Sequence, residues 1–228
     1  MKTVAIVNPT AGYRRARRVW PRLLASLGEA GANVATWWTE WPGHAETLAA
    51  RARREGFDRV VAVGGDGTLL EVVNGLWWES RGPQPSVGVV PFGTGCDYVR
   101  SFDLGPTLRD QVITALGEAT LRVSVGVVRL QGLDGQPRQR VFVNVLGLGF
   151  DARVIIGFRQ QRLRLPGKAA YFLSGLKELG RLPHHRITGS LNGRPLKTDA
   201  VVVVVGLGRY FAGGMIDRKS TRLNSSHT

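Results

Sequence analysis

The sequence predicts an α/β fold in which an N-terminal domain with a mainly parallel sheet is followed by an antiparallel β domain. The first observation is that short apolar runs alternate with segments of helical period over roughly the first hundred residues. The second is that strand-like runs after residue 120 flank Asp134-Gly135 and Asn192-Gly193, which are typical hairpin turns. The third is a composition of 43% hydrophobic and 21% charged residues, which is ordinary for a folded chain.

The first half is predicted to contain buried parallel strands separated by helices. The apolar, β-branched runs expected as strands are Thr3–Asn8, Asn33–Thr39, Arg59–Val63 and Val87–Val90. The segments with helical spacing are Arg14–Leu27, Ala45–Arg54 and the stretch carrying Leu69, Val72, Val73 and Leu76 on one face. Right-handed crossovers join such strands into a parallel sheet, and ligands bind beyond the carboxyl ends of its strands.

The second half is predicted to be mainly antiparallel. Its expected strands are Leu121–Leu130, Arg140–Leu146, Ile187–Leu191, Arg194–Lys197 and Ala200–Val205. One helix, Gly167–Leu179, is expected to interrupt them.

The charge and cysteine content restrict the partners and the compartment. Lys and Arg number 31 against 17 Asp and Glu, which gives a net charge of +14 and favours phosphates, nucleic acid or an anionic membrane. A single cysteine excludes an internal disulfide framework and suits a reducing compartment. No apolar run is long enough to span a bilayer, and the N-terminus lacks the layout of a signal peptide. We therefore expect a soluble, cytoplasmic protein.

The final twelve residues, Asp217–Thr228, are polar and have no periodicity. A disordered tail is one interpretation. The string also resembles the translation of a common sequencing-adapter oligonucleotide, which predicts that the natural protein continues differently after Ile216. Resequencing of the source locus would contradict this hypothesis if these codons stood in intact genomic DNA.

Three polar, glycine-containing loops follow predicted strands: Asn8–Gly12, Gly64–Thr68 and Pro91–Tyr98. Glycine lets the main chain turn sharply and approach a ligand, and the helix after Gly65 offers unpaired N–H groups that suit phosphate. Asp66 could hold a metal ion, orient a hydroxyl or accept a proton, whereas a tight turn capped by an aspartate is the structural alternative. Three such loops at one sheet edge predict a shared pocket.

These loops resemble the diacylglycerol kinase catalytic family, which includes bacterial lipid kinases and the sphingosine kinases. The resemblance rests on Asn8–Gly12, on GGDGTLLEVVNG from Gly64, on PFGTGCDYVR from Pro91 and on VNVLGLGFDA from Val143. It covers Met1–Ile216 and implies a two-domain kinase, with an α/β ATP-binding domain over 1–120 and a lipid-substrate β-sandwich domain over 121–216. It also implies transfer of the γ-phosphate of ATP, with Mg²⁺, to a lipid hydroxyl.

The same resemblance implies the roles of individual residues. The nucleotide-binding candidates are Asn8, Thr39, Gly65, Asp66, Gly67, Thr68 and Thr94. Asp97 resembles a carboxylate that is linked to Mg²⁺, and Asp151 is a candidate for orienting the lipid headgroup. Glu71 and Asn74 match the start of the helix that follows the phosphate loop.

Two positions and the C-terminal region depart from the family pattern. The family usually has asparagine where this chain has Leu70 and Cys96, and we expect Cys96 to be a small buried side chain rather than a reactive thiol. In the family, an Asp-Gly motif after a segment like Tyr210–Ile216 carries the proposed general base. The adapter-like string stands there instead, so Asp66 is the retained candidate for the catalytic base.

The expected partners are a lipid substrate and the anionic inner face of a membrane, with a homodimer left open. Arginine clusters such as Arg14–Arg18 suit anionic headgroups, although solvated helix faces are an alternative. No nucleic-acid module is recognisable, so no nucleic-acid partner is expected. The alternative functions are a kinase of a sphingoid base or another alcohol, and a nucleotide-binding fragment without catalysis.

Overall fold

The computed structural model describes residues 1–28, 33–78, 84–93, 95–132, 134–149, 185–208, 210–211 and 215–216. Thr94, Asp151, the predicted helix Gly167–Leu179 and the string Asp217–Thr228 lie outside the described residues. The chain packs as two compact units, one formed by Met1–Asn144 with the chain from Gly208 onward and the other by Val145–Leu207. Each unit is described by itself.

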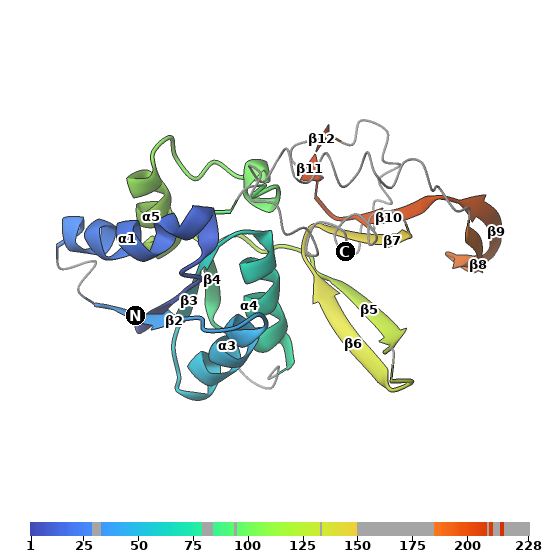
Figure 1. The fold of residues 1–228 in the computed structure, drawn as a ribbon, viewed down its shortest axis with the longest axis horizontal. Coiled ribbons are helices and arrows are strands. Elements are labelled where there is room, and N and C mark those ends of the chain that lie inside the picture. The colour runs from blue at the N-terminus through green and yellow to red at the C-terminus, as the bar shows by residue number, and fades with distance from the viewer. Residues whose placement is uncertain are drawn as a thin grey trace. The chain divides into compact units, whose positions relative to one another are not determined.

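The first unit is built on a parallel four-stranded sheet in the order β2-β1-β3-β4 (Figure 1). Its strands are β1 (Thr3–Val7), β2 (Val34–Trp38), β3 (Arg59–Gly64) and β4 (Ser86–Pro91). Every residue of β1 and β3 is buried, which explains the apolar runs Val4–Val7 and Val60–Val63 within them. The predicted strands and their parallel arrangement are confirmed.

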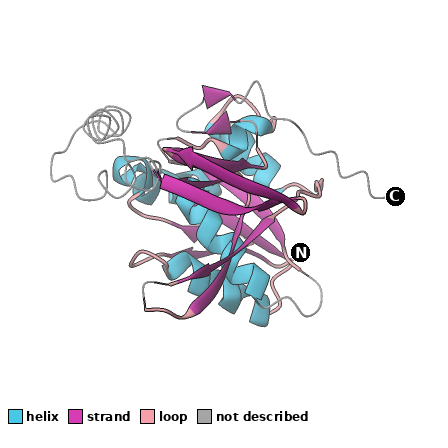
Figure 2. Cartoon of the chain, turned by 90° about the vertical axis from the view of Figure 1, so that its right-hand side faces the viewer, coloured by secondary structure: helices cyan, strands magenta, loops and turns pink. Residues whose placement is uncertain are grey.

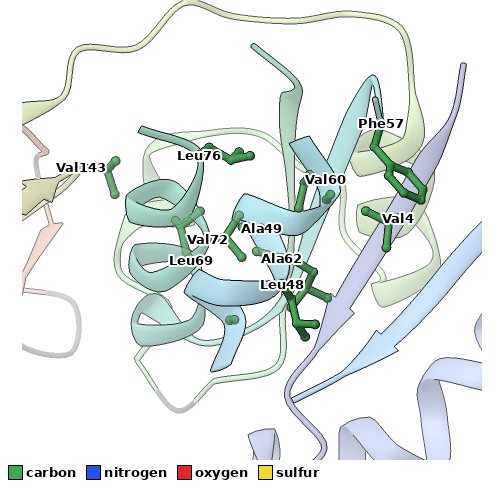
Figure 3. Packing of buried hydrophobic residues seen from close by; sticks show 13 residues of the cluster. Val4, Leu48, Ala49, Phe57, Val60, Ala62, Leu69, Val72, Leu76 and Val143 are labelled. Atoms are coloured by element: carbon green, nitrogen blue, oxygen red, sulfur yellow. The ribbon is translucent and has the colours of Figure 1, made fainter. Parts of the chain in front are cut away.

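Helices cover both faces of this sheet (Figure 2). They are α1 (Ala11–Ser26), α3 (His44–Arg54), α4 (Asp66–Trp78) and α5 (Leu108–Leu116), with a short 3₁₀ helix, η1, at Tyr98–Ser101. Alternate strand residues such as Ile6 and Val7 point to opposite faces. Ile6 packs in the cluster with α3 and α4, together with Val4, which Figure 3 labels, and Val7 packs in the cluster with α1 and α5.

The first described hairpin, β5 (Gly126–Gln131) with β6 (Pro137–Phe142), packs with the first unit. Arg140 of β6 pairs with Glu46 of α3 at 2.6 Å, and Val143 joins the buried cluster on α4 (Figure 3). In sequence, this hairpin belongs to the predicted lipid-substrate domain, which begins at residue 121. In the structure it packs with the α/β unit.

The prediction of one strand over Arg140–Leu146 is wrong. Strand β6 ends at Phe142 and β7 (Val145–Gly149) begins after Val143 and Asn144. The break arises because Val143 is buried among the residues of α4, and the Asn144 carbonyl accepts the N–H of Gly208 at 3.2 Å. The chain therefore leaves the hairpin at this point and enters the second unit.

The second unit contains two antiparallel pairs. Strand β7 pairs with β10 (Val202–Gly206), and β8 (His185–Leu191) pairs with β9 (Arg194–Ala200). The turn between β8 and β9 has φ of +51° at Asn192 and +77° at Gly193, so the predicted Asn-Gly hairpin is confirmed.

Two short strands of the first unit, β11 (Tyr210–Phe211) and β12 (Met215–Ile216), also pair. Over the described residues, no helix combines the length and hydropathy needed to cross a bilayer.

Candidate functional site

The loops that follow β1, β2, β3 and β4 meet at the carboxyl edge of the sheet. Main-chain hydrogen bonds beyond the strands hold them in place: Asn8 N–H donates to the Val63 carbonyl at 3.0 Å and Thr39 N–H to the Val7 carbonyl at 2.9 Å. Phe92 N–H donates to the Gly64 carbonyl at 2.8 Å. These hydrogen bonds therefore fix the residues that follow the strands against the ends of the neighbouring strands.

Glycine is required where these loops touch. A Cβ placed on Gly93 would lie 2.4 Å from the Gly65 Cα, and a Cβ on Gly12 would lie 2.7 Å from the Phe92 carbonyl oxygen. Gly12 also has φ of +57°, a conformation that side chains disfavour. The loops after β1, β3 and β4 thus pack main chain against main chain, which confirms that they meet at one edge of the sheet.

Helix α4 starts inside this site. Its first turn contains Asp66, Gly67 and Thr68, whose N–H groups have no acceptor within the helix. Thr68 is buried, and its hydroxyl accepts a hydrogen bond from Asn8 Nδ2 at 3.4 Å. A Cβ on Gly67 would meet no atom within 4 Å, so open space lies over this turn. The arrangement suits an anionic group, which the helix dipole also favours.

The carboxylate of Asp66 connects the helix start to the loop after β4. Its Oδ2 accepts the N–H of Asp97 and its Oδ1 accepts the N–H of Tyr98, each at 3.1 Å. Both oxygens therefore contact the main chain that leads into η1. A carboxylate oxygen has two lone pairs, so each atom retains capacity for another partner. Asp66 can hold this loop and still face a ligand.

Asp97 is buried, and its Oδ1 lies 3.5 Å from Arg100 Nε. A Cβ built on Gly95 would lie 3.5 Å from Asp66 Oδ2 and 3.9 Å from Asp97 Oδ2, so the two carboxylates flank the same glycine. Among the described side chains, no group of three or more His, Cys, Asp or Glu residues could hold a metal ion. Two hard carboxylates nevertheless fit Mg²⁺, which usually keeps several waters and takes only one or two protein carboxylates.

Cys96 directly precedes Asp97 and has φ of +49°. Burial is the main cause that raises the pKa of its thiol to about 11, and the negative charge of Asp66 acts in the same direction. Its sulfur lies 4.0 Å from the Gly64 carbonyl oxygen.

We therefore expect Cys96 to resist alkylation. At pH 8 iodoacetamide should modify it about a hundredfold more slowly than a free cysteine, because only the thiolate reacts. The rate should rise as the pH approaches 11. Intact-mass spectrometry over time measures the rate, and the same protein unfolded in guanidinium is the control. Equal rates in the folded and unfolded protein would contradict the inert environment.

Two residues of α4 have contacts that sequence reasoning did not predict. Glu71 accepts the N–H groups of Gly43 and Ala45 at the start of α3, and Asn74 binds the main chain of Val141. Their motif position was the only signal in the sequence, because neither partner segment is near them along the chain.

The structure brings most predicted site residues to one edge. Asn8 contacts Thr68, and Asp66 contacts the main chain of Asp97. Gly65 joins β3 to α4, Gly67 lies in the first turn of α4, and Thr39 follows β2 at that edge. Thr94 and Asp151 lie outside the described residues.

Glycine loops and a helix start at the carboxyl edge of a parallel sheet are typical of α/β proteins that bind phosphate groups. Residues 2–128 match the diacylglycerol kinase catalytic domain, which is over half of the 228 residues. The chain belongs to the diacylglycerol kinase catalytic family, as the motifs predicted.

The similar proteins agree with this assignment. The diacylglycerol kinase of Staphylococcus saprophyticus is 28% identical over 208 residues, which are 91% of this chain and 65% of that protein. The diacylglycerol kinase of Staphylococcus haemolyticus is also 28% identical, with 60% of its length matched. The chain thus spans less than two thirds of these curated relatives.

A solved structure shows the same fold. The crystal structure of a diacylglycerol kinase from Bacillus anthracis superposes with a TM-score of 0.64 at 22% identity. The match covers 95% of this chain and 66% of that one. The predicted α/β class, with a parallel sheet and later antiparallel strand pairs, is therefore confirmed.

Proposed function

We propose that the protein is an ATP-dependent lipid kinase that transfers the γ-phosphate of ATP to the hydroxyl of diacylglycerol or a related lipid. The observation that carries this proposal is the contact of Asp66, at the open start of α4, with the loop after β4. It combines a phosphate-binding helix start with carboxylates, which are the groups that phosphoryl transfer to an alcohol requires. The family match supports the same reaction.

Nucleotide binding is assigned to the residues of the converging loops. The first turn of α4 would receive phosphate oxygens through its main-chain N–H groups, with Asn8 holding Thr68 in place. The proposed set is Asn8, Thr39, Gly65, Asp66, Gly67, Thr68 and Thr94. Asp97, with Asp66 across Gly95, would hold Mg²⁺ through water. The ion would neutralise charge on the phosphates during transfer.

The proposed reaction needs one proton acceptor. The lipid hydroxyl oxygen forms a bond to the γ-phosphorus, the bond from that phosphorus to the bridging oxygen breaks, and ADP leaves. The hydroxyl proton passes to a carboxylate, for which Asp66 is the candidate in this chain. Asp151 is the proposed contact for the lipid headgroup.

A nucleotide-binding protein without catalysis is the second candidate function. One observation favours it: both oxygens of Asp66 already accept main-chain N–H groups, so a role in holding the loop after β4 accounts for its position without any proton transfer. A kinase of a sphingoid base or another alcohol is an alternative acceptor choice for the same site.

The decisive experiment supplies γ-labelled ATP and Mg²⁺ with a panel of acceptors. The panel holds diacylglycerol in mixed micelles, a sphingoid base and glycerol, and ATP binding is measured separately by calorimetry. Label in the diacylglycerol product supports the lipid kinase. Label in another acceptor alone would show that the kinase acts on that acceptor instead of diacylglycerol. ATP binding without label in any acceptor supports the non-catalytic candidate.

We further infer that α1 meets the anionic cytoplasmic face of a membrane. Five arginines of this helix are exposed, and within the described part of the chain none is recorded in an ion pair with a carboxylate. They are Arg14, Arg15, Arg17, Arg18 and Arg22. Each basic residue near an anionic surface contributes about 1 kcal/mol, and salt screens the attraction.

The triple change Arg15→Gln, Arg18→Gln and Arg22→Gln is expected to weaken binding to phosphatidylglycerol vesicles about a hundredfold at low salt. These three arginines recur at helical spacing. Vesicle sedimentation at increasing salt measures the effect. The control changes three exposed arginines elsewhere, Arg122, Arg129 and Arg194, to glutamine. An equal loss in the control would show that binding follows net charge rather than α1.

A further inference from the structure

Helix α4 holds the main chain of two segments that are far from it in sequence. Glu71 and Asn74 lie one turn apart on this helix, and each binds the backbone of a different element. Glu71 reaches the start of α3, and Asn74 reaches β6. Because the same helix begins at Asp66 in the phosphate loop, both segments are fixed relative to that loop.

The side-chain amide of Asn74 forms with Val141 of β6 the pair of hydrogen bonds that a neighbouring strand would form. Its Oδ1 accepts the N–H of Val141 at 3.1 Å, and its Nδ2 donates to the Val141 carbonyl at 3.0 Å. The second hydrogen of Nδ2 goes to the Leu70 carbonyl at 2.8 Å. The side chain is only 3% exposed, and Val141 is 2% exposed. Only an amide of this length supplies the acceptor and both donors.

Glu71 binds the segment that follows β2. Its Oε1 accepts the N–H of Gly43 at 3.1 Å and its Oε2 accepts the N–H of Ala45 at 3.2 Å. Gly43 caps α3 with φ of +90° and contributes no side-chain cap, so Glu71 supplies the negative group at that helix start. The segment so fixed begins at Thr39, which is assigned to the nucleotide.

We propose that Asn74 and Glu71 are positioning residues that serve different substrates: Asn74 sets the β6 side for the lipid, and Glu71 sets the Thr39 segment for ATP. This inference rests on the proposed lipid kinase function. Strand β6 itself lies within residues 121–216, the part assigned to the lipid. Displacement of β6 therefore disturbs that part, and release of Gly43 disturbs the segment assigned to the nucleotide.

The variant Asn74→Asp tests the role proposed for Asn74 with almost no change in side-chain volume. A carboxylate keeps an acceptor for the Val141 N–H but places negative oxygens against the carbonyls of Val141 and Leu70. We expect KM for the lipid to rise about tenfold while KM for ATP stays within about twofold. If this variant does not fold, Asn74→Ser removes the same contacts without the charge.

The matched variant on the same helix is Glu71→Gln, which loses the charge and one acceptor but keeps the side-chain length. We expect the reverse split, with KM for ATP raised about fivefold and KM for the lipid nearly unchanged. Hydrogen exchange locates the released segment in each variant: peptides covering 137–142 for Asn74→Asp, and peptides covering 39–46 for Glu71→Gln.

The outcomes separate the two proposals. A wild-type protein that phosphorylates no lipid overturns the proposed function together with the substrate split. An active wild-type protein whose two variants change both KM values equally, or change only thermal stability, overturns the split alone. Opposite shifts of the two KM values support it, because a purely structural role would not separate the substrates.

Discussion

Replacement of Asp66 by alanine is expected to lower the rate of phosphoryl transfer by at least about a hundredfold. The change removes a carboxylate at the start of α4 and two main-chain hydrogen bonds, those from Asp97 and Tyr98. Either loss is damaging, since the first removes the proposed proton acceptor and the proposed contact to Mg²⁺, and the second frees the loop after β4. Turnover of labelled ATP with diacylglycerol measures the effect, and wild-type rates in this variant would refute the role.

The variant Asp66→Asn distinguishes the two roles of Asp66. Its amide oxygen can accept one of the two N–H groups, but it takes up no proton at neutral pH. If Asp66 acts as the base, this variant should bind ATP with nearly normal affinity and still turn over about a hundredfold or more slowly. If Asp66 mainly holds the loop, ATP affinity should fall in both variants. Calorimetric titration with ATP, together with steady-state rates, gives both quantities.

The largest effect on stability is expected from Trp20→Ala. Trp20 is a fully buried residue of α1, and its indole N–H donates to the Thr36 hydroxyl at 3.1 Å. Removal of such a ring leaves a cavity between α1 and the sheet and costs about 3–5 kcal/mol of unfolding free energy. Urea unfolding followed by circular dichroism measures the loss.

The control for this change is Thr36→Val, which keeps the shape of the strand residue and removes only the acceptor for the Trp20 indole. Its expected cost is about 1 kcal/mol. Similar losses in both variants would show that the hydrogen bond, rather than ring burial, stabilises α1 on the sheet. A loss below about 1 kcal/mol in Trp20→Ala would contradict the assigned packing.

The sheet could be predicted because its residues are buried on both faces. Strands β1 and β3 each contain four consecutive apolar residues, and their predicted limits agree with the structure to within a residue. The convergence of the glycine loops followed from the same pattern, because parallel strands present their carboxyl ends at one edge. The Asn-Gly turn at Asn192 was readable because this dipeptide favours positive φ at both positions.

Other features depend on partners distant in the chain. In the sequence, Asn74 looks like any polar residue on a helix. The residue that its amide binds, Val141, lies 67 positions away. The break between β6 and β7 could not be predicted, because the run is interrupted only by Asn144, and the break is caused by the burial of Val143 and the contact of Asn144 with Gly208. Helix α5 begins at a capping box of Thr107 and Asp110, a polar signal that hydrophobic spacing alone does not report.

The close approach of Gly65 and Gly93 has a consequence for how this site can change by substitution. A methyl group on Gly93 would press on the main chain of the neighbouring loop at 2.4 Å, and no rotamer of a flexible side chain can relieve that overlap. Neither glycine can be exchanged in a single step without a shift of the opposite backbone. The two loops therefore behave as one unit under mutation, and libraries that vary the site should leave this pair of glycines fixed.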